Sequence, residues 1–115
     1  INGVVFLASP LSLNHGTVHH ELNGWIYAYR RTTPGCQAGM DTTWVMGKND
    51  VPQPDIFLRI LPEWGGQSSA TAGGKYGQGA PELIVELCGS SLSRDLGAKL
   101  ELYRREGVRE YLTAD

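Results

Sequence analysis

Two carboxylates in apolar strand sequences are the first candidates for chemistry in this chain. Glu86 lies within the run PELIVELC at residues 81–88, and Asp55 follows Pro54 at the start of the apolar run 56–60. Burying an unpaired carboxylate costs roughly several kcal/mol unless a cation compensates its charge. Mg²⁺ prefers oxygen ligands and often takes only one or two protein carboxylates together with water. Two carboxylates near the ends of neighbouring strands therefore form a candidate site for a divalent cation.

Lys99 is the third candidate. With about 100° per residue, a helix over residues 92–106 places Lys99 inside an apolar arc. The other members of that arc are Leu92, Asp95, Leu96, Leu100, Leu102 and Tyr103. A lysine aimed at a sheet needs an anionic partner, which Glu86 and Asp55 would supply. Alternatively, its stem lies along the core while the ammonium reaches water.

Each of these residues also has a structural interpretation. Glu86 alone would serve as a buried carboxylate that binds the start of the final helix, and an aspartate after proline is often only a strand-start residue. Lys99 and Asp95 are four residues apart, the spacing of an ordinary helical ion pair. Three inward charged residues from three elements are harder to explain in this way together, so we prefer the catalytic interpretation.

Other patterns carry weaker signals. His15 and His19 are four residues apart and suit a metal pair, but their place at the edge of an apolar stripe favours boundary residues. The glycines of residues 65–79 resemble a phosphate loop only in composition, since no GxxxxGK[ST] or GxGxxG motif precedes a helix. We interpret these glycines as the mark of a flexible loop.

The elements that must position the candidates alternate along the chain. We expect strands at residues 2–8, 40–46, 53–60, 82–88 and 108–115, and a long, irregular loop at 62–79. Alternation along 82–88 puts Glu86 on one face with Ile84 and Cys88. The opposite face carries Leu83, Val85 and Leu87.

Two helices complete this arrangement. The first is expected from a cap at Asn14 to about Arg31, and it buries a stripe of Val18, Leu22, Trp25 and Tyr29 with Ile26 beside it. The second spans 92–106, with a cap at Ser91 or Ser93 and an end at Gly107. The order predicts an α/β (α+β) domain in which helices flank a mixed sheet.

Composition limits the classes of function. The 115 residues are 41% hydrophobic and 19% charged, enough for one packed core, and we expect one domain that lacks its N-terminal lead-in and final strands. A net charge of -2 gives no general attraction for polyanions. Cys36 and Cys88 have neither disulfide nor metal spacing, which fits a reducing cytoplasm. The apolar run 4–7 is too short for a membrane span.

Several motifs together resemble a known family. They are Pro54-Asp55, APELIVE at 80–86, Ser90-Ser91, RDLGAKLELY at 94–103, GVREY at 107–111 and Asp115, with Ser9-Pro10 and His15-Gly16 ahead of the first helix. This pattern resembles the Uma-type family of bacterial restriction-endonuclease-like proteins, a branch of the PD-(D/E)xK nuclease superfamily.

The resemblance implies a core of helix, three strands, helix and strand, and Mg²⁺-dependent hydrolysis of phosphodiester bonds in DNA, with Mn²⁺ as a substitute. Asp55 and Glu86 fall on the metal-binding positions. Cys88 stands where the superfamily places lysine, and Lys99 matches a lysine that such family members carry on the following helix. Asp95 would orient Lys99, and Tyr103 and His15 are further candidates around the site. A homodimer would suit cleavage of both strands.

Two other classes of function stay open. Fold does not fix function, so the chain is alternatively a nuclease-fold protein that binds nucleic acid or a protein partner without cutting. It is also compatible with a structural or dimerisation module, whose anchors would be Trp25, Tyr27, Tyr29, Trp44 and Trp64.

Overall fold

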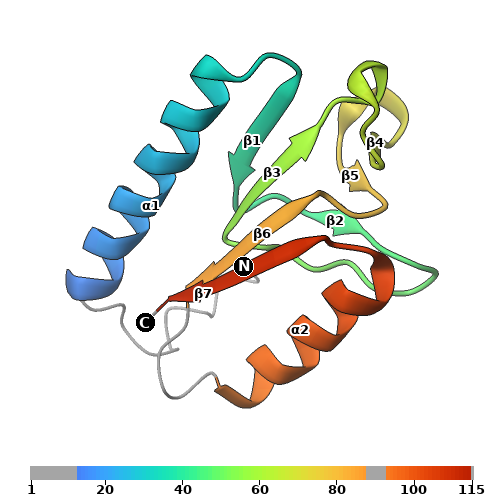
Figure 1. Ribbon diagram of the computed structural model, residues 1–115. Coiled ribbons are helices and arrows are strands. Elements are labelled where there is room, and N and C mark those ends of the chain that lie inside the picture. Colours follow the sequence, from blue (N-terminus) through green and yellow to red (C-terminus); the bar gives the residue numbers. More distant parts are fainter. Residues whose placement is uncertain (1–12, 88–92, 115) are drawn as a thin grey trace.

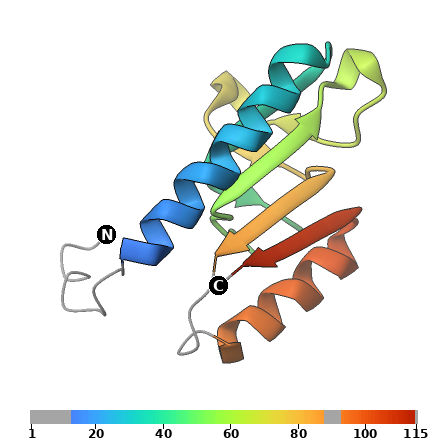
Figure 2. The ribbon, with the colours of Figure 1, turned by 60° about the vertical axis from the view of Figure 1, so that its left-hand side comes forward.

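The computed structural model of the protein describes residues 13–87 and 93–114, with the backbone alone described at 93–96 and 114. A mixed four-stranded sheet lies between two helices, α1 (Leu13–Thr32) and α2 (Ser93–Glu106) (Figures 1 and 2). Its strand order is β1 (Cys36–Met40), β3 (Ile56–Ile60), β6 (Leu83–Leu87) and β7 (Glu110–Ala114). β1, β3 and β6 are antiparallel neighbours, and β7 runs parallel to β6. The predicted fold class is confirmed; the strand predicted at 2–8 lies outside the described residues.

The two faces of the sheet belong to different cores. Ile84 of β6 packs with Phe57 and Tyr103 on the α2 face, in a cluster that also contains Trp44, Met46, Ala80 and Val108. Val85 and Leu87 pack with Ile56 on the α1 face. The predicted alternation along β6 is therefore confirmed, and it places Glu86 on the face that α2 covers.

α1 buries a different stripe from the predicted one. The helix begins at Leu13, so Asn14 lies inside it rather than at its cap. Trp25 and Tyr29 are 77% and 53% exposed, and the residues that pack on the sheet are Val18, Leu22 and Ile26. The reason is that α1 contacts mainly β1 and β3, so the side of the helix toward β6 borders an open groove. Periodicity alone does not show which neighbours cover a helix.

Strand β1 was not predicted, whereas the strand expected at 40–46 shortens to β2 (Trp44–Val45). The sequence CQAGM of β1 has no β-branched residue, so it carries little strand propensity. Pairing with β3 compensates, from Cys36 opposite Ile60 to Met40 opposite Ile56. Gly39 is required by packing, because a Cβ there would lie 2.7 Å from the Phe57 ring.

Residues 62–79 are more regular than the expected loop. They contain two 3₁₀ turns (Pro62–Trp64 and Ala72–Gly74) and two short strands, β4 (Ser69–Ala70) and β5 (Gly77–Gln78), which form a second sheet with β2. A Cβ at Gly77 would lie 2.4 Å from the Trp44 indole, so this glycine permits close packing rather than flexibility. Trp44 is only 1% exposed, which makes it a core residue and not an interface anchor.

Gln67 connects this segment to the rest of the domain. Its side-chain nitrogen donates to the carbonyl oxygens of Ala80 at 3.1 Å and Gly107 at 2.7 Å, and its Oε1 accepts from Arg109 Nε at 3.1 Å. Its backbone N–H donates to Glu82 Oε2 at 3.0 Å. One side chain thus holds the loop against the turn between α2 and β7.

We expect Gln67→Ala to lower the free energy of unfolding by about 1 to 3 kcal/mol, because two carbonyl groups lose their donor. Gln78→Ala is the matched control, since Gln78 is exposed in β5, and its effect should stay within about 0.5 kcal/mol. Equilibrium unfolding in urea measures both. Equal values for the two variants would contradict an anchoring role for Gln67.

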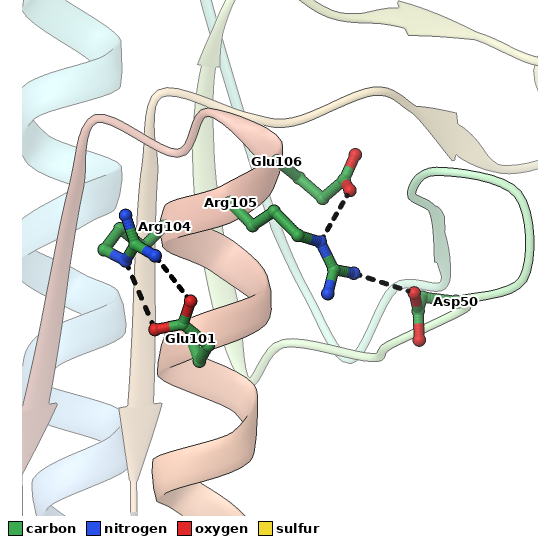
Figure 3. A network of polar contacts seen from close by, with 5 residues as sticks. All are labelled: Asp50, Glu101, Arg104, Arg105 and Glu106. Atoms are coloured by element: carbon green, nitrogen blue, oxygen red, sulfur yellow. Dashed lines mark hydrogen bonds and ion pairs between the residues drawn. The ribbon is translucent and has the colours of Figure 1, made fainter.

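Polar contacts on the outer side of α2 join it to the turn after β2. Arg105 donates to Asp50 Oδ2 at 3.1 Å and to Glu106 Oε2 at 3.2 Å, and Arg104 pairs with Glu101 along the helix (Figure 3). Exposed ion pairs contribute about 0 to 1 kcal/mol each. The position of α2 therefore depends mainly on its apolar face. Gly107, with a φ of 100°, ends the helix as predicted.

Candidate active site

The register of β3 and β6 brings the two candidate carboxylates together. Ile56 pairs with Val85 in an antiparallel ladder, so residue 55 comes opposite Glu86. Asp55 Oδ2 accepts a hydrogen bond from the backbone N–H of Leu87 at 2.7 Å. This bond fixes the Asp55 carboxylate beside the end of β6.

Two residues of α2, one helical turn apart, contact the two oxygens of Glu86 separately. The Tyr103 hydroxyl donates to Oε2 at 2.5 Å, and Lys99 Nζ lies 3.5 Å from Oε1. Glu86 is 2% exposed, whereas the Lys99 side chain keeps 44% of its surface in solvent. The structure thus confirms that Lys99 reaches a sheet carboxylate, and its ammonium does so from the solvent edge.

The electrostatics of this cluster favour a bound cation. Burial raises the pKa of Glu86 above its ordinary value, and the nearby charge of Asp55 raises it further, while the Tyr103 hydrogen bond and Lys99 lower it. Burial and the bond to Glu86 also raise the pKa of Tyr103, so its hydroxyl stays protonated and donates. A divalent cation would relieve the cost of ionising Glu86 beside Asp55, and carboxylate oxygens are the ligand type that Mg²⁺ prefers. The donor set therefore fits such an ion.

One further predicted site residue, His15, stands apart from this cluster. His15 lies on α1, which packs on the opposite face of the sheet, and its ring meets His19 edge-on with centroids 6.3 Å apart. Asp95 falls in α2, but its side chain and all of Cys88 lie outside the described residues. Within the described part of the chain, no group of three or more His, Cys, Asp or Glu residues is placed to hold a metal. Among the described residues, the candidate site thus contains two carboxylates, those of Asp55 and Glu86.

A large cavity lies elsewhere. A groove of about 1130 Å³ runs between α1 and strands β3 and β6, bordered by the rings of Trp25, Tyr29 and Trp64. Neither Asp55 nor Glu86 lines it. A buried acidic group that has a raised pKa and meets a lysine indicates chemistry more directly than cavity volume does, so we place the candidate site at Glu86.

Sequence reasoning did not foresee two contacts of the site. The Leu87 amide reaches Asp55 only because of the strand register, which no local pattern specifies. The hydrogen bond of the Tyr103 hydroxyl was only weakly indicated by the sequence. A tyrosine inside an apolar arc needs a hydrogen-bond acceptor when it is buried.

The sequence profile of the Uma2 family, described as "Putative restriction endonuclease", matches residues 1–115. The chain belongs to the Uma2 family. Its predicted family resemblance is thereby confirmed, and the family description indicates a nuclease-type function. No curated protein matches the chain.

Among solved structures, the Uma2 chain is similar to one described as "a putative nuclease belonging to DUF820" from Anabaena variabilis ATCC 29413, with a TM-score of 0.64 and 17% sequence identity. The match covers 90% of this chain and 57% of that protein, so the chain spans little more than half of that protein's length. At this identity the likeness establishes the fold.

Proposed function

We propose that this Uma2 chain hydrolyses phosphodiester bonds of DNA at a site where Asp55 and Glu86 hold Mg²⁺. The proposal depends mainly on one observation: carboxylates from two paired strands and the ammonium of Lys99 meet on one face of the sheet. Mn²⁺, another hard cation, is expected to substitute for Mg²⁺.

The roles of the residues follow from their surroundings. Asp55 is oriented by the Leu87 amide, and Glu86 is held between α2 and the sheet. When bound, Mg²⁺ would supply a more acidic water and neutralise phosphate charge. The partly exposed Lys99 ammonium is able to leave Glu86 Oε1 and to stabilise the negative charge that develops on the phosphate. Alternatively, its neutral amine form would accept the proton of the water.

The type of nucleic acid, the cellular location and the oligomeric state are also part of the proposal. We propose DNA as the nucleic acid, a cytoplasmic location and a homodimer, because two sites would cut both strands of a duplex. None of the described helices is long and apolar enough to cross a membrane. Light scattering after size-exclusion chromatography measures the oligomeric state.

Metal titration and plasmid cleavage test the proposed function. We expect Mn²⁺ to bind the wild-type protein and to stabilise it by about 2.7 kcal/mol at one hundred times the dissociation constant. Asp55→Ala should lose binding and cleavage. Asp50→Ala should retain both, because the Asp50 side chain pairs with Arg105 on the outer side of α2.

Two results would contradict the proposal. Cleavage by Asp55→Ala at the wild-type rate would exclude Asp55 from the reaction. Wild-type protein that binds neither Mn²⁺ nor Mg²⁺ would instead support the alternative of a nuclease-fold binding module without catalysis.

A further inference from the structure

We propose that Tyr103 is a positioning residue, whose hydroxyl holds Oε2 of Glu86 so that Oε1 remains available to the metal. This inference rests on the proposed function. It concerns a residue that touches neither metal nor substrate and acts only through Glu86.

The Tyr103 ring is held rigidly. Tyr103 has no exposed surface and belongs to the core cluster on the α2 face. The other buried members of this cluster come from several parts of the chain and include Trp44, Met46, Phe57, Ile84 and Val108. Because such a core is densely packed, the hydroxyl has a fixed position relative to β6.

The two contacts of Glu86 differ in strength and mobility. The Tyr103 bond of 2.5 Å has the short length of a charge-assisted O–H···O⁻ hydrogen bond. Lys99 Nζ is 3.5 Å from the other oxygen, and its side chain is 44% exposed. Oε2 is therefore bound by a fixed donor, whereas Oε1 is contacted by a group that is free to move into solvent.

This asymmetry determines the orientation of the carboxylate. The terminal torsion of glutamate is otherwise broad, so one fixed oxygen restricts the directions in which the other points. Groups that hydrogen-bond to metal-binding carboxylates in this way typically change metal affinity by about 10- to 100-fold when they are removed. We expect that range for the loss of the Tyr103 hydroxyl.

A purely structural role makes a different prediction. If the hydroxyl only satisfied a buried oxygen, its removal would destabilise the protein equally with and without metal. If it positions Glu86, its removal must also weaken metal binding. The gain in melting temperature on addition of Mn²⁺ separates the two roles.

The experiment compares Tyr103→Phe with Tyr111→Phe, which removes a hydroxyl from a tyrosine packed against the same cluster. Calorimetry measures Mn²⁺ affinity, and thermal unfolding with and without Mn²⁺ measures the metal-dependent gain. We expect about 10- to 100-fold weaker binding for Tyr103→Phe and wild-type binding for Tyr111→Phe. Replacing Tyr103 by 4-aminophenylalanine keeps the ring and a weaker donor, so it should restore part of the affinity.

Each outcome has one meaning. Wild-type Mn²⁺ affinity in Tyr103→Phe overturns the positioning role and leaves the metal site intact. No Mn²⁺ binding by the wild-type protein overturns both the metal site and this inference. If Tyr103→Phe does not fold, the 4-aminophenylalanine variant decides: weakened Mn²⁺ binding supports the inference, and wild-type binding overturns it.

Discussion

Replacing Glu86 by glutamine is expected to remove nuclease activity and also to make the folded protein more stable near neutral pH. Both effects follow from the environment of one carboxylate, which is 2% exposed and close to a second acidic group. Glutamine is a poor ligand for a hard cation, but it keeps an acceptor for the Tyr103 hydroxyl. Its amide NH₂ is also able to donate toward Asp55.

The effect on activity is large. A bound metal supplies several kcal/mol of transition-state stabilisation, and each 1.36 kcal/mol corresponds to about a factor of ten in rate. We therefore expect a loss of at least about 10³-fold in plasmid cleavage by Glu86→Gln. The stability gain without metal should be up to about 2 kcal/mol, the usual range when an unfavourable functional group is removed.

The pH dependence of stability provides an independent check. The folded-state pKa of Glu86 is raised above its ordinary value of 4.5, so the folded protein holds this proton more tightly than the unfolded chain. Stability from this group is present at acidic pH and falls as the pH rises from the unfolded pKa through the folded one. Glu86→Gln should abolish this part of the slope when urea unfolding is measured with chelator at several pH values.

Glu82→Gln is the matched control for that experiment. The Glu82 carboxylate accepts backbone N–H groups of Ile60 at 2.8 Å and Gln67 at 3.0 Å. Glutamine would turn a donor toward one of them, so this variant should lose stability while its metal affinity is retained. Activity in Glu86→Gln, or an unchanged pH slope, would contradict the proposed role of Glu86.

The contact between Glu86 and Lys99 was more predictable from sequence than the path of the chain around it. Glu86 and Lys99 were recognised because each breaks a local pattern: a charge in an apolar strand and a charge in an apolar helical arc. Such conflicts are expected at functional sites. Their contact at 3.5 Å follows once α2 packs on the face that β6 presents.

The features of the fold that were not predicted depend on neighbours that the local sequence does not specify. β1 forms because β3 offers a pairing edge to CQAGM, and propensity gives no sign of it. Gly77 belongs to a segment with the composition of a flexible loop, but this glycine permits close contact with Trp44. The exposure of Trp25 depends on where α1 stops covering the sheet. In each case a distant element determines the outcome.

Replacing Lys99 by methionine is expected to lower cleavage by about 10²- to 10³-fold, the usual cost of removing one group that stabilises transition-state charge. Methionine keeps the length and apolar stem of the side chain, so α2 should keep its packing. Lys99 is not a metal ligand in the proposal. Mn²⁺ affinity measured by calorimetry should therefore persist while the cleavage rate falls.

This separation of binding from catalysis distinguishes Lys99 from the carboxylates. Lys75→Met is the matched control, because it removes an exposed lysine that lies 5.4 Å from the Tyr76 ring, in the 62–79 segment. It should leave cleavage and metal affinity unchanged.

Lys99→Arg keeps the charge but changes its shape and reach, so we expect only part of the activity to return. Wild-type cleavage by Lys99→Met would show that Lys99 does not take the role that the resemblance to the PD-(D/E)xK superfamily assigns to a lysine. Of the described charged groups, Asp55 and Glu86 would then remain as the site, with its cation in the catalytic role.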